Sequence, residues 1–218
     1  MSRTKAEHSS KGNRKLSAAE QRRLDRFQDT CNRMSVAGYA QENLTVRPVA
    51  ANVATLVAAV PLVFLTFWLY RTFAPTSATD SFEVDLELPL ILTAFALIFV
   101  HELVHGLAWV IFSHNRLDDI EFGVMWKYLM PYCTCKQPLE LGPYVAGGLA
   151  PLVLLGVVPF VIGIAIGNLP VTILGALMAL SATGDVMIVA KLLRFRTDAR
   201  EVVIFDHPTE AGSVIFTR

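Results

Sequence analysis

Four apolar segments dominate the chain, and each is close to the length that a helix needs to cross a lipid bilayer. They are Ala50–Tyr70, Leu88–Phe112, Leu149–Ile166 and Val171–Leu193. About 20 apolar residues span the hydrocarbon core, where only helices or closed barrels satisfy the backbone polar groups. With 53% hydrophobic and 17% charged residues, the chain is too apolar for a water-soluble domain of this length. The sequence therefore predicts an all-α integral membrane protein with four transmembrane helices.

Lysine and arginine are distributed unevenly among the segments that flank these helices. Ten of the 19 lie before Pro48, three lie within residues 113–148, and five lie from Lys191 onward. Residues 72–87 and 167–170 contain none. Because cytoplasmic segments carry the excess of positive charge, we expect a multi-pass protein of the cell membrane with both termini in the cytoplasm.

The polar parts of the chain divide it into three regions. We expect a basic cytoplasmic arm over residues 1–48, a four-helix membrane domain carrying a metal site over 49–193, and a cytoplasmic tail over 194–218. Residues 17–20 resemble a capping box that begins a helix in the arm. Its narrow apolar stripe consists of Leu24, Phe27, Cys31 and Met34. This helix either lies on an anionic membrane surface or docks on the protein's own cytoplasmic face.

Two short β-hairpins are expected outside the membrane. Residues 118–126 partly alternate polar and apolar side chains, and residues 129–134 can return as a second strand. This cytoplasmic hairpin between the second and third helices either only joins them or holds an extended peptide by strand addition. In the tail, residues 201–205 and 213–216 predict another short hairpin.

The second apolar segment contains the sequence His101-Glu102-Leu103-Val104-His105. Histidines four residues apart lie on one face of a helix, so both imidazoles can reach one metal ion. The intervening glutamate can take a proton from a metal-bound water, as in the H-E-x-x-H arrangement of zinc metallopeptidases. An ionisable residue at this depth costs about 2.5–3.5 kcal/mol on insertion scales, which a metal ion would offset. We therefore interpret His101 and His105 as metal ligands and Glu102 as the general base, against the alternative of buried structural residues.

A catalytic zinc ion usually has three protein ligands and one open position. Asp185 is the best third candidate, because it lies in the fourth segment at the same expected depth as His101. Both residues lie roughly 20 Å along their helices at about 1.5 Å per residue. The adjacent Gly184 leaves room for a neighbouring helix or for the metal. The alternative is a buried aspartate bonded to Thr183 or to a helix end. Weaker candidates are His114, His207, Glu121, Asp118 and Asp119.

Cys133 and Cys135 in the expected hairpin allow another interpretation. Two cysteines at this spacing can bind a soft metal or cycle as a dithiol, although a lone pair is a weak signal. The small residues within 144–151 favour close packing of the third helix against its neighbours.

In these motifs the chain resembles the membrane-embedded zinc metalloproteases of the site-2 protease type, and it is most similar to their zincin-peptidase branch. The resemblance covers residues 87–218. It is carried by His101–Gly106, Gly184-Asp185, Phe122-Gly123 and Leu149-Ala150-Pro151. It implies that Zn²⁺ is held by the two histidines and the aspartate, with the glutamate as base. It also implies cleavage of membrane-anchored proteins near the cytoplasmic leaflet.

The sequence thus predicts an intramembrane zinc metalloendopeptidase that hydrolyses peptide bonds of membrane-associated proteins, with Glu102 as general base on zinc-bound water. Expected partners are the lipid bilayer and a membrane protein or peptide substrate, and not nucleic acid. The alternative is a non-catalytic protein in which zinc staples the second and fourth helices for assembly. That alternative predicts that Glu102→Gln leaves function intact. A metal or proton transporter is disfavoured, because residues 88–100 contain only small hydroxyls such as Thr93 and no ionisable side chain.

Overall fold

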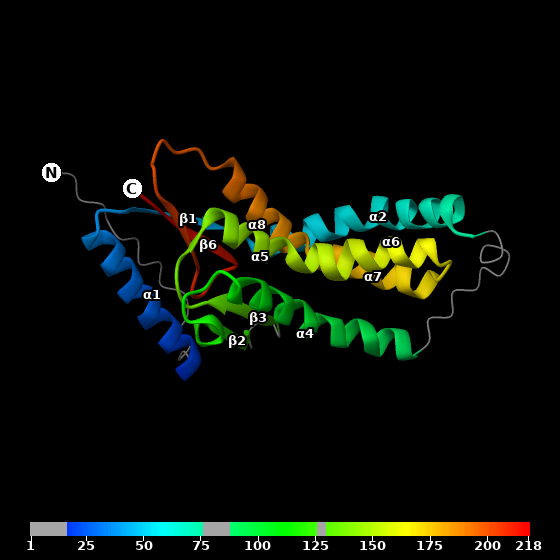
Figure 1. Ribbon diagram of the computed structural model, residues 1–218, viewed down its shortest axis with the longest axis horizontal. Helices are drawn as coiled ribbons and strands as arrows, with labels where there is room; N and C mark the ends of the chain where they lie inside the picture. Colours follow the sequence, from blue (N-terminus) through cyan, green and yellow to red (C-terminus); the bar gives the residue numbers. More distant parts are fainter. Residues whose placement is uncertain (1–16, 76–87, 126–129) are drawn as a thin grey trace.

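The computed structural model describes residues 17–75, 88–125 and 130–218. Long helices lie side by side in one half of the molecule, and short strands with one further helix form the other half (Figure 1). Residues 1–16 of the arm, most of the acidic connection before the second helix and the tip of the first hairpin, 126–129, lie outside the described residues.

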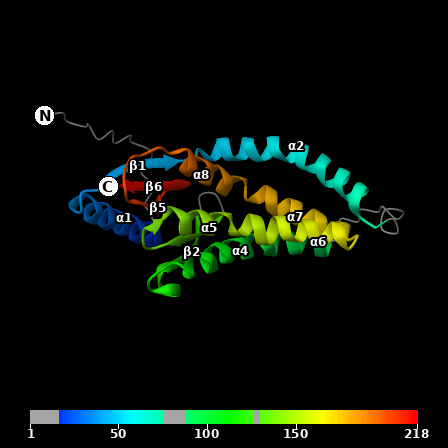
Figure 2. The same cartoon turned by 45° about the horizontal axis from the view of Figure 1, so that its top comes forward.

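Three helices are long and apolar enough to cross a membrane, or four if a bent pair is counted as one span. The three are α2 (Pro48–Phe73), α4 (Leu88–Val110) and a continuous run of α5 (Leu141–Pro151), the π-helical η2 (Leu152–Val157) and α6 (Val158–Ala165). The bent pair consists of α7 (Leu169–Ser181) and α8 (Thr183–Arg194), whose axes differ by 46°. Figure 2 shows that α2, which contains Pro61, is curved.

The fourth predicted segment forms two helices, α7 and α8, because the chain bends at Ala182. The hydroxyl of Ser181 donates to the carbonyl of Met178, and the hydroxyl of Thr183 donates to the carbonyl of Leu180. Hydroxyl side chains that bond to backbone carbonyls one turn earlier compete with the helical pattern and bend helices. The third helix also differs from the prediction, since it begins at Leu141 and continues through a glycine-rich stretch.

The all-α prediction is wrong in one respect, since two antiparallel sheets accompany the helices. The predicted first hairpin is present as β2 (Ile120–Met125) and β3 (Met130–Cys135). The tail hairpin is present as β5 (Val202–Asp206) and β6 (Gly212–Thr217). It is extended to four strands in the order β1-β6-β5-β4 by β1 (Ala40–Thr45) and β4 (Leu139–Glu140). Both additions escaped the sequence analysis because β1 is mostly exposed and lacks alternation, and β4 has only two residues.

Helix α1 (Ala18–Val36) begins with the predicted capping box, in which Ser17 and Glu20 exchange side-chain and backbone hydrogen bonds. Its apolar stripe packs against the four-stranded sheet. The contacting residues are Phe27, Cys31 and Met34 on the helix and Phe205, Val214 and Phe216 on the strands. Of the two alternatives for this helix, docking on the protein itself is therefore the one observed.

A second apolar core joins the helices to both sheets. It contains Trp109, Ile120, Cys135, Leu139, Tyr144, Leu192, Ile204 and Ile215. Helix α1, the four-stranded sheet and the C-terminus all lie at this end of the helix bundle, which we call the sheet end (Figures 1 and 2). The side of the membrane that the sheet end faces stays a prediction from the charge distribution.

Candidate metal centre

Helix α4 presents His101 and His105 on one face, as their spacing predicts. Both side chains are buried, and their rings meet edge to face with centroids 4.9 Å apart. The two residues lie 13 and 17 positions after Leu88, so they are nearer to the sheet end of α4 than to its start. Glu102 is half-buried on the same helix.

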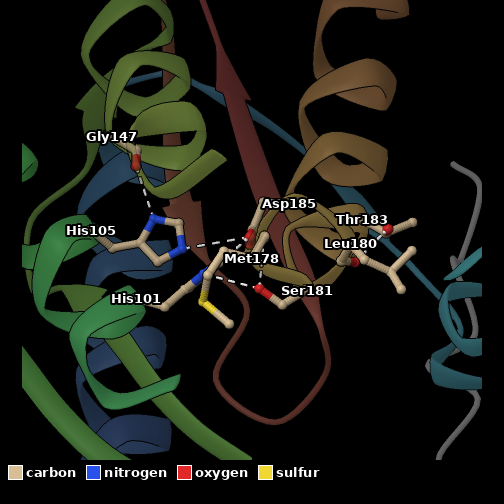
Figure 3. A network of polar contacts seen from close by, with 8 residues as sticks. All are labelled: His101, His105, Gly147, Met178, Leu180, Ser181, Thr183 and Asp185. Carbon is tan, nitrogen blue, oxygen red and sulfur yellow. Dashed lines mark hydrogen bonds and ion pairs between the residues drawn. The ribbon is translucent and has the colours of Figure 1, made fainter. Parts of the chain in front are cut away.

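Asp185 reaches the two histidines from the first turn of α8 (Figure 3). Its Oδ2 atom lies 3.1 Å from Nε2 of His101 and 3.6 Å from Nε2 of His105. Ligand atoms of the three residues all lie within 4.8 Å of one another. The structure therefore brings together the three side chains that the sequence analysis selected as metal ligands, one of them from a distant helix. Nothing packs within 4 Å of a Cβ added at Gly184, so no neighbouring helix takes the room that this glycine leaves. The alternative, room for the metal, stays a prediction.

The hydrogen bond of His105 to Gly147 determines which ring nitrogen is available to a ligand. Nδ1 of His105 lies 2.8 Å from the carbonyl oxygen of Gly147. Because a carbonyl can only accept, Nδ1 carries the proton and Nε2 of the neutral ring presents its lone pair toward Asp185. This is the usual outer contact of a metal-bound histidine, in which the second nitrogen donates to a carbonyl or carboxylate.

Ser181 is the partner of Nδ1 of His101, as the carbonyl of Gly147 is for His105. Its hydroxyl proton is donated to the carbonyl of Met178 at 2.8 Å, so its oxygen can accept from Nδ1 of His101 at 3.4 Å. Two imidazole lone pairs and one carboxylate then face a common point. Such a set of acceptors requires a cation among them, either a proton on a ring or a metal ion. A His-His-carboxylate set suits zinc, with one position left for water or substrate.

A stack of aromatic rings supports His105 from the sheet end. The Trp109 indole lies one turn later on α4 and stacks on the imidazole at 5.5 Å, and Tyr144 of α5 stacks on the indole at 5.6 Å. The indole N–H donates to the carbonyl of Tyr144 at 3.4 Å. A Cβ at Gly147 would overlap the indole, so only glycine permits this contact. The sequence analysis did not assign Trp109, although its spacing of four residues from His105 was a usable signal.

The first hairpin packs against α4 directly beside the metal centre. A Cβ at Gly106 would lie 2.5 Å from Cζ of Phe122 and 3.1 Å from Sγ of Cys133. The backbone N–H of Cys133 lies within hydrogen-bonding reach of the Glu102 carboxylate. The glutamate therefore lies between the histidine pair and strand β3.

The cysteine pair of β3 is largely buried beside the metal centre. Burial raises the pKa of the Cys133 thiol, and burial also raises the pKa of Cys135 to about 11. In the metal-free protein these surroundings favour the neutral thiols. Among the described residues, no third histidine, cysteine or carboxylate joins the pair in a metal-binding group.

The weaker ligand candidates are engaged or placed elsewhere. Glu121 forms an ion pair of 2.6 Å with Arg26, and Asp119 accepts hydrogen bonds from Asn115. Nδ1 of His207 accepts from two backbone N–H groups of its own turn, and burial lowers the pKa of this histidine. His114 is exposed beyond the end of α4. None of these residues joins the cluster of three, so Asp185 remains the third candidate ligand.

A protein-family model described as "Putative zincin peptidase" matches residues 94–200, which include the whole candidate metal centre. The chain is thus similar to a family of zincin-like metallopeptidases over the region from α4 to α8. No curated protein and no solved structure matches the chain.

Proposed function

We propose that the protein is an intramembrane zinc metallopeptidase that hydrolyses peptide bonds of membrane-associated proteins. The observation that carries the proposal is the convergence of two imidazole nitrogens and the Asp185 carboxylate beside Glu102. A zinc ion held by this set would act as a Lewis acid and make a water molecule more acidic. The similarity to zincin peptidases over the same residues supports this reading.

Glu102 is the proposed general base. It follows the first histidine on α4, so its carboxylate can remove a proton from the attacking water and return it to the leaving amine. A general base is more effective when its position is restricted, and the backbone N–H of Cys133 in β3 is within reach of this carboxylate. Ser181 and the carbonyl of Gly147 hold the histidine rings with their Nε2 atoms facing inward.

The β2–β3 hairpin supports the substrate class. In the described part of the chain this sheet has two strands, so each strand keeps one edge free of a further strand. An extended peptide can add to such an edge through main-chain hydrogen bonds. Because the hairpin packs on α4 next to the metal centre, a peptide paired with it would pass close to Glu102.

Zinc content and cleavage test the proposal together. We expect about one zinc per chain in the purified protein by elemental analysis, lost in His101→Ala and Asp185→Ala and kept in His114→Ala and Glu102→Gln. Labelled casein and a set of single-span peptides, supplied in detergent, serve as cleavage probes. We expect Glu102→Gln to lose cleavage while it keeps zinc. Absence of zinc in the wild type, or full cleavage by Glu102→Gln, would contradict the proposal.

The non-catalytic alternative has one supporting observation of its own. The cluster joins α4 to α8, and the bond of His105 to Gly147 adds α5, so a metal would hold three helices together. If the metal has only this structural role, zinc removal lowers the thermal midpoint, and neither the wild type nor Glu102→Gln cleaves any probe. The transporter alternative finds no support, since the hydroxyl of Thr93 bonds back to Pro89 of its own helix.

A further inference from the structure

A cavity of about 440 Å³ lies between the first turns of α1 and the outer face of the β2–β3 hairpin. This volume is within the range of small-molecule sites, roughly 300–1,000 Å³. Its charged and aromatic lining includes Glu20, Arg22, Arg23 and Arg26 of α1, Glu121 and Tyr132 of the hairpin, and Lys136 just after β3. The cavity shares none of these residues with the metal centre.

The cavity carries an excess of positive charge. The carboxylate of Glu121 is paired with Arg26 at 2.6 Å. Arg23 lies over the Tyr132 ring at 4.1 Å, and Lys136 donates to a backbone carbonyl. Arg22 is exposed and forms no hydrogen bond or ion pair within the described residues. The cavity lining therefore holds four cationic side chains and two carboxylates, Glu20 and Glu121, and the positive charges outnumber the negative ones. Arg23 also lies near the buried Asp206 carboxylate.

The position of the hairpin places this cavity at the border between apolar and polar surroundings. Successive side chains of a strand point to opposite faces. On one face of β2, Phe122 packs over Gly106 of the membrane-spanning α4, and Phe122 and Val124 remain 50% and 37% exposed. On the other face, Glu121 meets the arginines of α1. An apolar face beside a basic face is the arrangement expected where lipid headgroups meet acyl chains.

We propose that the cavity binds the phosphate group of an anionic phospholipid from the leaflet at the sheet end. Guanidinium groups match phosphate oxygens in charge and geometry. Basic pockets beside membrane helices are a recurrent place for such headgroups. The exposed Phe122 and Val124 on the adjacent face give the acyl chains an apolar surface, which a free phosphate does not need.

The bound lipid would connect α1 to the strand that borders the metal centre. Arg23 contacts Tyr132, and the next residue in β3 is Cys133, whose N–H faces Glu102. A phosphate held by the arginines therefore stabilises the position of the hairpin beside α4. This inference is independent of peptidase activity and of bound metal.

Native mass spectrometry of the full chain in detergent tests the proposal. The probes are phosphatidylglycerol and phosphatidylcholine. The cavity variant is Arg22→Gln/Arg23→Gln, and the matched control is Arg194→Gln/Arg196→Gln, which removes the same charge from exposed residues at the end of α8. We expect one retained phosphatidylglycerol per chain, with affinity reduced at least about tenfold in the cavity variant and unchanged in the control.

Further arms separate the possible ligands and exclude misfolding. Equal losses in both double variants, or equal retention of phosphatidylcholine, would overturn the proposal in favour of general surface attraction. Protection of the thermal midpoint by inorganic phosphate or glycerol 3-phosphate as strong as by the lipid would assign the cavity to a soluble phosphate. Preferential binding of an acidic peptide would assign it to a protein partner. The single Arg22→Gln change touches no described contact, so a wild-type thermal midpoint with weakened lipid binding would support the proposal.

Discussion

Replacing Gly147 by alanine tests whether the contact between α4 and α5 positions the proposed ligand His105. A Cβ at this position would overlap the indole of Trp109, which is buried and stacked on the imidazole. The ring can move only by leaving that stack or by pushing α5 away from α4. Either movement disturbs the 2.8 Å bond between Nδ1 of His105 and the carbonyl of residue 147.

The expected magnitude follows from two terms. Overpacking of a close contact costs about 1–3 kcal/mol of folding free energy. Loss of the outer partner of a metal-bound histidine weakens metal affinity by about 10–100-fold, equivalent to about 1.4–2.7 kcal/mol. We therefore expect Gly147→Ala to lower the thermal midpoint and to weaken zinc binding within that range. Competition with a chromophoric chelator in detergent measures the affinity.

Two other glycines of α5 provide graded controls. Nothing lies within 4 Å of a Cβ added at Gly142, so Gly142→Ala is expected to bind zinc as the wild type does. At Gly148 the nearest atom would be Cγ2 of Val189 at 3.3 Å, and a small effect is expected. Equal zinc affinities in Gly147→Ala and Gly142→Ala would refute the reasoning, because the position of His105 would then not depend on this contact.

Three further predictions concern other parts of the structure. Ser181→Ala is expected to weaken zinc binding by up to about tenfold, because it removes the hydroxyl beside Nδ1 of His101. Thr183→Ala removes a hydroxyl that bonds to the carbonyl of Leu180 instead, so zinc binding should be unchanged. Competition with a chelator measures both affinities. Burial raises the pKa of Asp206, so its stabilising contribution is present below pH of about 4 and is lost as pH rises through the folded-state pKa. As the pH rises from about 4 through the folded-state pKa, the thermal midpoint of the wild type should therefore fall relative to that of Asp206→Asn. Thermal midpoints that change in parallel with pH in the two proteins would contradict this. Phe27→Ala should weaken the docking of α1 on the sheet by about 2 kcal/mol, which faster trypsin cleavage within α1 would show. Gln28 is exposed, so Gln28→Ala should leave the cleavage rate unchanged.

Local patterns explain which parts of the fold could be predicted. Each apolar run had to form a helix, because a bilayer leaves no other partner for backbone polar groups. The capping box at Ser17 and the alternation in the two hairpins also depend on residues close in sequence, and all three are present. Strand β1 could not be predicted, because its pairing partner β6 lies at the opposite end of the chain and its own side chains are mostly exposed.

The candidate metal centre shows the same division between local and distant contacts. The sequence alone determined that His101 and His105 share a helix face beside Glu102, because four residues make about one helical turn. It indicated Asp185 by depth, but only the tertiary structure decided how that carboxylate arrives, through a bend at Ala182 and across 84 residues of separation. The partners of the ring nitrogens, Gly147 and Ser181, were also decided there, because contacts 42 and 80 residues apart depend on how helices pack rather than on any local period.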